Sequence, residues 1–163
     1  MINWFAILFL FAALSVAAQT NSAITSNTAS RAEQARAACV EGRRYVCGRV
    51  MQITPEGLVV ESGFTSLMKP PLRPSWVIPA NVSATRDPNA VEAREPDSPC
   101  IGLVFVTDIP KKPAVNLYDY VVLHAYPAGQ YVYTPVAPVQ KIIRKFSAGL
   151  DTAVKLSLQP GGK

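Results

Sequence analysis

Residues 45–62 read YVCGRVMQITPEGLVVES, and this stretch decides the fold class. Its two halves, residues 45–53 and 58–62, are rich in the β-branched and aromatic residues that favour strands. Pro55 and Gly57 stand between the halves, at the second and fourth positions of a four-residue turn, where each is favoured. The pattern predicts an antiparallel hairpin, and Gly48 in mid-strand predicts a bend or a close backbone contact.

Further short apolar runs follow this hairpin, separated by turn residues. We expect strands at residues 76–78, 82–85, 101–107, 118–126, 131–137, 139–146 and 154–158. Short strands at close spacing predict a mainly β protein with a small antiparallel barrel, and the lack of long intervening helices disfavours a parallel α/β sheet. About five or six strands fit a barrel like the oligonucleotide/oligosaccharide-binding (OB) fold or an SH3-like barrel.

A short helix is expected before the sheet, over residues 30–42. Ser30 and Glu33 have the spacing of a capping box, in which each side chain satisfies a free backbone N–H of the other. Gly42 suits the left-handed position that follows a helix. We therefore expect one β-barrel domain over residues 30–158, including this helix, with residues 159–163 as a tail.

Residues 1–18 have the pattern of a signal peptide. They contain an uncharged apolar run, and small residues precede the expected cleavage site after Ala18. The run is too short for a comfortable spanning helix, which needs about 20 residues. No Lys or Arg precedes it, which leaves an uncleaved anchor as the alternative. We expect a secreted or periplasmic protein with a flexible leader at residues 19–29 and no membrane span after cleavage.

The charge of the chain gives little information about a partner. All 16 Lys and Arg and all 11 Asp and Glu lie outside residues 1–18, so the mature chain keeps the net charge of +5. A positive balance speeds association with anionic partners. The basic residues are scattered in ones and twos, however, as on ordinary solvated surfaces.

The most informative stretch for function is YDYVVLHAYPAGQYVYTP, residues 118–135. A turn at residues 127–130 would place Tyr126 opposite Tyr131 and His124 opposite Tyr133. Alternation would then gather the rings on one face, and aliphatic residues on the other face would form the core. The candidate binding residues are Tyr118, Tyr120, His124, Tyr126, Tyr131 and Tyr133.

Three interpretations of this tyrosine face remain open. The rings form cross-strand pairs that stabilise a covered hairpin. Alternatively, they form a stacking platform for bases or sugar rings, with nearby Lys and Arg binding phosphates or carboxylates. The third interpretation is a patch that binds a protein.

Cys39, Cys47 and Cys100 all belong to the expected mature chain. In an oxidising compartment, an odd number of cysteines predicts one bridge and one unpaired thiol. If the helix turns straight back into the first strand, Cys39 and Cys47 lie at similar heights, which favours that pair. A bridge from Cys100 to either is the alternative. Three unpaired thiols would count against export.

The sequence offers little support for catalysis. His124 is the sole histidine, so a Cys-based hydrolase would need it beside Cys47 or Cys100, with Asp119 or Asp108 as the orienting group. Nothing in the spacing requires this arrangement. No metal-ligand pairs and no Gly-rich phosphate loop are present, so neither a metal nor a cofactor is expected.

We therefore expect an exported, non-catalytic β-barrel module that binds a partner or has a structural role in a cell envelope. A binder of anionic polymers, either an oligonucleotide or an acidic glycan, is the alternative. A small Cys/His hydrolase is the enzymatic contrast.

Overall fold

The computed structural model describes residues 29–69, 77–90, 92, 98–111, 113–136 and 138–159. The chain divides into two compact units, residues 1–34 and 35–163. The helix expected over residues 30–42 is observed over 29–41, so it begins at the last residue of the expected leader. The expected signal peptide, the rest of the leader and all of the tail after Gln159 lie outside the described residues.

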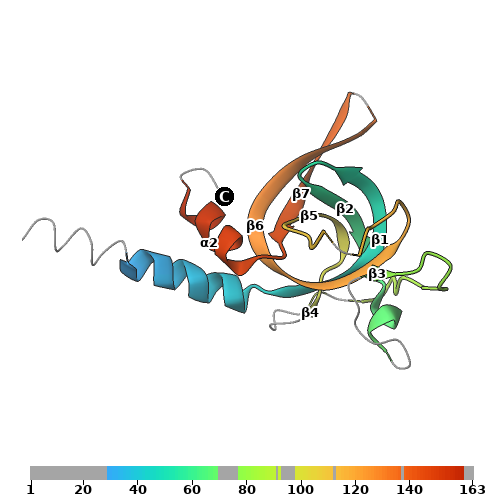
Figure 1. Ribbon diagram of the computed structural model, residues 1–163, viewed down its shortest axis with the longest axis horizontal. Helices are drawn as coiled ribbons and strands as arrows, with labels where there is room; N and C mark the ends of the chain where they lie inside the picture. Colours follow the sequence, from blue (N-terminus) through green and yellow to red (C-terminus); the bar gives the residue numbers. More distant parts are fainter. Residues whose placement is uncertain are drawn as a thin grey trace, which may run out of the picture. The chain divides into compact units, whose positions relative to one another are not determined.

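The second unit contains a seven-stranded mixed sheet. Its strands are β1 (Arg44–Thr54), β2 (Gly57–Ser62), β3 (Val77–Ile78), β4 (Ser98–Pro99), β5 (Gly102–Thr107), β6 (Tyr120–Val136) and β7 (Val139–Ser147). The strand order is β3-β6-β7-β5-β2-β1-β4, and β1 also pairs with β6. Strands β1, β2, β5, β7 and β6 therefore follow one another around a partial ring (Figure 1). The expectation of a mainly β protein is confirmed.

The sheet is mixed, so the expectation of purely antiparallel strands is wrong. Strands β5 and β7 run parallel, from Val104 opposite Arg144 to Thr107 opposite Ser147. The other four neighbour pairs of the ring are antiparallel. A ring of five strands cannot alternate direction at every step, because five is odd, so at least one neighbouring pair must be parallel.

The predicted hairpin of β1 and β2 is confirmed, with Thr54 opposite Gly57. The Thr54 hydroxyl donates to the Gly57 carbonyl at 2.9 Å and accepts from the Gly57 N–H at 3.1 Å. The close contact expected at Gly48 is also present, since a Cβ atom there would lie 2.1 Å from the Glu61 carbonyl oxygen. Only glycine allows the two strands to approach this closely.

Three apolar clusters hold the strands together. The cluster that joins β1, β2, β5, β6 and β7 consists of Val46, Val50, Leu58, Val60, Cys100, Val104, Val106, Val121, Ala125 and Phe146. A second cluster lies beneath the 3-10 helix η1 (Thr65–Met68) and consists of Cys47, Phe64, Leu67, Ile78, Tyr120 and Val122. The third consists of Val59, Phe105 and Ile143, from β2, β5 and β7. Each cluster uses alternate residues of its strands, as the two faces of a sheet require.

Two expected strands are wrong. Residues 82–85 form no strand, and Val82 and Ala84 pack against the cluster under η1. Residues 154–158 belong to helix α2 (Leu150–Leu158), beside β6 in Figure 1. The alternation of Val154, Leu156 and Leu158 suggested a strand, but Asp151 in the first turn favours the positive end of a helix dipole. Asp151 also forms an ion pair with Arg36 at 2.8 Å.

Candidate functional site on the β6–β7 ribbon

Strand β6 is one continuous strand of 17 residues whose two halves pair with different strands of the ring. Its first part pairs with β1, and its second part, from Tyr126 onward, pairs with β7. The expected turn at residues 127–130 is therefore wrong. The ladder is instead irregular between Pro127 and Gly129, and Gly129 has a φ of 102°. Such a glycine bends a strand at a bulge, where a proline without an N–H is also tolerated.

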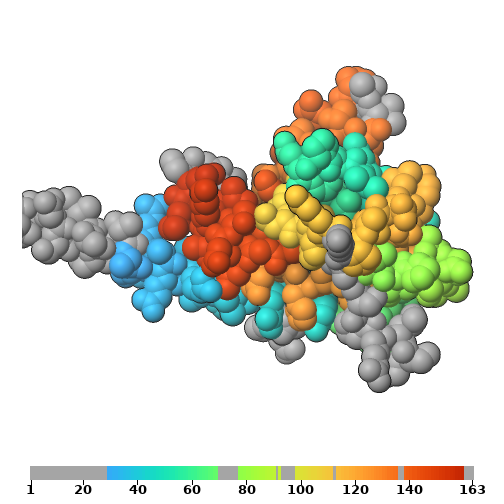
Figure 2. Space-filling view, viewed as in Figure 1, coloured from blue at the N-terminus to red at the C-terminus, as the bar shows by residue number. Residues whose placement is uncertain are grey.

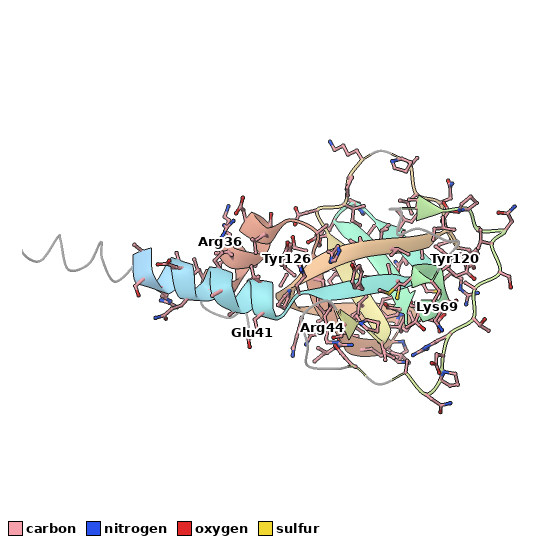
Figure 3. The ribbon with its side chains drawn as sticks, turned by 90° about the horizontal axis from the view of Figure 1, so that it is seen from below. Arg36, Glu41, Arg44, Lys69, Tyr120 and Tyr126 are labelled. Atoms are coloured by element: carbon pink, nitrogen blue, oxygen red, sulfur yellow. The ribbon has the colours of Figure 1, made fainter. Side chains whose placement is uncertain are left out.

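The rings of the expected tyrosine face lie in different surroundings along β6. Tyr120 is buried in the cluster under η1, with its ring centroid 5.5 Å from that of Phe64. Tyr118 precedes the strand in a turn, with a φ of 69° and a residue exposure of 54%. Figure 3 shows Tyr120 and Tyr126 at separate places along the strand. The structure therefore does not gather the six residues into one open platform.

The two cross-strand pairs expected from the turn are absent. Tyr126 lies opposite Ser147 rather than Tyr131. His124 lies opposite Tyr45 of β1 rather than Tyr133, and its ring centroid is 4.0 Å from that of Tyr45. The expected aliphatic face of this part of β6 is confirmed, since these residues pack into the cluster between the ring strands: Val121, Leu123 and Ala125.

Tyr131 stacks on Phe105, with ring centroids 3.7 Å apart and an interplanar angle of 11°. Tyr133 packs against the same cluster. Phe105 is fully buried, so this contact attaches the second half of β6 to the outer side of β5. One face of the Tyr131 ring is therefore covered by protein.

Beyond this contact, β6 and β7 continue as a two-stranded ribbon, defined as residues 130–136 and 139–143. Figure 2 shows these strand ends standing out from the surface beside the turn of β1 and β2. Val132 lies opposite Ile142, and their exposures are 55% and 70%. Val139 is 52% exposed. An exposed cross-strand aliphatic pair is unusual, because burying such side chains is favourable.

The ribbon carries positive charge without a compensating carboxylate of its own. Residues 120–147 contain no Asp or Glu. Lys141 is exposed and lies opposite Tyr133, whereas Lys145 is half-buried near the base. Within the described part of the chain, neither lysine forms an ion pair. The ribbon thus combines exposed aliphatic side chains with one uncompensated cation, Lys141.

Arg144, at the base of the ribbon, is by contrast compensated. Its guanidinium group contacts the Glu92 carboxylate at 2.5 Å and donates to the Ile101 carbonyl at 2.7 Å. The same carboxylate lies 3.5 Å from Arg44 of β1. Glu92 therefore joins β1 to β7 electrostatically, and the Arg144 charge is not available for an external anion.

A second surface feature is an open groove of about 440 Å³ between the β1–β2 turn and residues 108–115. Its lining includes Ile53 and the charged side chains of Asp108 and Lys111. The Asp108 carboxylate accepts a hydrogen bond from the Ser147 hydroxyl at 2.6 Å. That bond fixes the chain before α2, so Asp108 has a structural role.

The expected disulfide is absent, because all three cysteines are unpaired and buried. The Cys39 thiol lies 3.9 Å from the Pro127 carbonyl oxygen. Cys47 lies opposite Val122, which is five residues away from Pro127 on β6. At about 3.3 Å per residue along β6, Val122 and Pro127 are about 16 Å apart. Cys47 and Cys39, which lie beside these two residues, are therefore too far apart to form a disulfide. Cys100, the alternative partner, packs into the cluster between the ring strands.

Burial also makes these thiols poor nucleophiles. Desolvation raises the pKa of the Cys47 thiol to about 11 and that of the Cys100 thiol to about 12. Desolvation raises the pKa of Cys39 as well. A catalytic cysteine needs a lowered pKa, because the thiolate is the reactive form. These surroundings count against the Cys/His arrangement considered from the sequence.

Alkaline pH should destabilise the fold through these two thiols. The unfolded chain loses the thiol protons near pH 9.0, whereas the native state keeps them up to about pH 11 at Cys47 and about 12 at Cys100. Because the native state then binds more protons, the free energy of unfolding falls as pH rises above 9. Urea titrations at about pH 8 and about pH 10.5 should show a smaller fall for Cys47→Ala than for the wild type. Equal falls would contradict this assignment.

Two searches of the described residues and three comparisons bear on function. No cluster of three or more His, Cys, Asp or Glu side chains in the described ranges could hold a metal ion. No helix in those ranges combines the length and apolar character needed to cross a bilayer. The chain matches no protein-family model, no curated protein and no solved structure.

Proposed function

We propose that this protein is an exported, non-catalytic module with an OB-like β-barrel, which works by binding a partner or as a structural part of a cell envelope. The observation that carries the proposal is the exposed Val132–Ile142 pair on the ribbon. A ribbon that extends exposed aliphatic side chains beyond the folded core is suited to contact another molecule. The proposal assigns no chemical step to the protein.

The strand connections support the OB-like assignment. Strands β1, β2 and β5 pair in succession as antiparallel neighbours, and β6 returns to lie beside β1. This order is a Greek key, which distinguishes an OB-like barrel from a simple meander. Strand β7 then lies between β6 and β5. In OB folds, the loop between the last two strands takes part in ligand binding, and the ribbon occupies that place here.

Export is supported by the sequence of residues 1–18 and opposed by the unpaired cysteines. Unpaired thiols are less common in oxidising compartments, where disulfides form and persist. Burial and the raised pKa values reduce the reactivity of these thiols towards oxidation. The export proposal therefore requires that these three thiols stay reduced in the compartment that the protein reaches.

The anionic-polymer function remains the second candidate. The favouring observation is the position of Tyr133 opposite Lys141 on a ribbon with no carboxylate between residues 120 and 147. A ring beside a cation is the combination that binds a base or sugar together with its phosphate or carboxylate. The buried Tyr120 and the stacked Tyr131 leave fewer rings for this purpose than the sequence suggests.

Export and use of the ribbon can be tested in the same cells. The protein recovered from the envelope or the medium should begin at Gln19. Ile142→Asp should keep the wild-type circular dichroism spectrum, because Ile142 is 70% exposed, but a smaller fraction should co-sediment with the envelope. A chain that keeps Met1 and stays in the cytosol would contradict export. Unchanged co-sedimentation of the Ile142→Asp variant would contradict a role for the ribbon.

The second candidate predicts a salt-dependent interaction. Titration with a single-stranded oligonucleotide and with an acidic glycan should change the intrinsic fluorescence, and the affinity should fall as salt is raised. Tyr133→Ala should weaken this binding, whereas Tyr118→Ala, outside the ribbon, should leave it unchanged. No fluorescence change, or a change indifferent to salt, would remove this candidate.

A further inference from the structure

We propose that the free edge of β7 in the ribbon binds an extended acidic segment of a partner protein, which adds a strand alongside residues 139–143. This inference rests on the proposed binding function and names the class of partner for the ribbon. Recognition would combine backbone hydrogen bonds with two kinds of side-chain contact, one on each face of the ribbon.

The edge of β7 is the first element of the argument. Strand β7 pairs with β5 from Arg144 to Ser147. Residues 139–143 pair with β6 on one side, and on the other side no strand among the described residues lies against them. A free strand edge presents N–H and C=O groups in the spacing that an incoming strand needs.

The two faces of the ribbon define the side chains that the added strand would carry. Ile142 and its partner Val132 are exposed on one face, whereas Lys141 lies opposite Tyr133 on the other. Side chains of an added strand alternate between these two faces. The complementary segment therefore places an apolar residue beside Ile142 and a carboxylate beside Lys141, on opposite faces of the added strand.

Charge complementarity selects the partner. A second copy of this chain would bring another ribbon without carboxylates against Lys141, and like charges opposite each other in a sheet are destabilising. A nucleic acid would need rings on which to stack, but the most exposed apolar side chains of the ribbon are aliphatic: Val132, Val139 and Ile142. An acidic protein segment with alternating apolar residues satisfies the edge, the cation and the aliphatic pair together.

A synthetic peptide tests the inference directly. The probe is a blocked, fluorescently labelled peptide of alternating valine and glutamate, about eight residues long, which exceeds the exposed edge. We expect the full-length protein to bind it with an affinity that falls as salt is raised. Two further peptides carry backbone N-methyl groups on alternate residues, one at the odd and one at the even positions. Each loses the N–H donors along one edge of the strand. The peptide methylated on the edge that faces β7 should therefore bind at least about tenfold more weakly. An alternating valine–lysine peptide should not bind.

Charge reversal on the ribbon gives the matched comparison. Lys141→Glu should lose the glutamate peptide and acquire binding of the lysine peptide, and it should remain folded because Lys141 is exposed. Lys111→Glu makes the same charge change at an exposed lysine in the groove lining, outside the ribbon. This variant should still bind the glutamate peptide, like the wild type, and should not bind the lysine peptide.

Four outcomes overturn the inference. They are no binding of the glutamate peptide, equal binding of all N-methylated forms, binding unaffected by Lys141→Glu, and binding of an oligonucleotide in place of the peptide. The last of these leaves the anionic-polymer candidate standing. Reduced co-sedimentation of Ile142→Asp without peptide binding would retain the proposed function of the ribbon and reject the acidic strand.

Discussion

Gly48→Ala is expected to destabilise the protein by on the order of 3–5 kcal/mol, a large part of the total stability of a typical domain. A Cβ atom at this position would lie 2.1 Å from the Glu61 carbonyl oxygen and 2.7 Å from the Ser62 Cα. Both neighbours are backbone atoms of β2, so no rotation of a side chain relieves the overlap. The strands must separate where the ring joins β1 to both β2 and β6.

Gly149→Ala is the control for this substitution. A Cβ atom on Gly149 would have its nearest contact at 3.6 Å, from Asp108, and the backbone φ is −100°. Alanine fits this space and adopts this φ without strain. The substitution should therefore lower the free energy of unfolding by no more than about 1 kcal/mol. Urea denaturation followed by circular dichroism measures both variants. Similar midpoints for Gly48→Ala and the wild type would show that β1 and β2 can separate without loss of the ring.

The sequence predicted local pairing well, because the information lies within a few residues. The hairpin at Thr54 and Gly57 and the close approach at Gly48 follow from turn and glycine chemistry. The helix lies near its expected place, but it already includes residue 29, before the expected cap Ser30, and Gly42 does not have the expected left-handed φ. Each of these features depends on neighbouring positions rather than on distant contacts. The helix at Val154, which the sequence pattern predicts as a strand, shows the limit, since two-residue alternation over five residues cannot exclude a helical turn.

The candidate site was predicted less well, because its geometry depends on long-range pairing. The Pro127–Gly129 segment contains the residues of a turn, and the same residues also suit a bulge. A bulge forms instead of a turn because β1 and β7 pair with β6 on either side of this segment. No signal within residues 118–135 indicates those partners, so the sequence alone predicts a hairpin that does not form.

One feature of the sequence marks the positively charged part of the ribbon. The absence of Asp and Glu over residues 120–147 is unusual in a chain with 11 acidic residues. It marks the segment in which Lys141 and Lys145 form no ion pair with another described residue. Composition over a window, rather than a motif, would have indicated the positively charged surface.

Phe105→Ala is expected to cost about 3–5 kcal/mol, since it removes a fully buried ring and leaves a cavity. It should also release the ribbon, because the Tyr131 ring loses the surface on which it stacks. Urea denaturation measures the stability, and limited trypsin digestion at Lys141 and Lys145 reports the release. The control is Tyr118→Ala, which removes an exposed ring and should change stability by about 0.5 kcal/mol or less.

A double-mutant cycle between Phe105→Leu and Tyr131→Leu isolates the stacking contact. We expect a coupling energy of about 0.5–1.5 kcal/mol, the range found for aromatic pairs. A coupling near zero would mean that Tyr131 is held by the strand pairing of β6 and β7 alone, and its ring would then be able to turn towards a ligand. A coupling in the expected range means that the Tyr131 ring stays packed on Phe105 and does not turn towards a ligand. In that case the second candidate function depends on Tyr133 and Lys141, and the β7 edge is the part of the ribbon best suited to bind a partner.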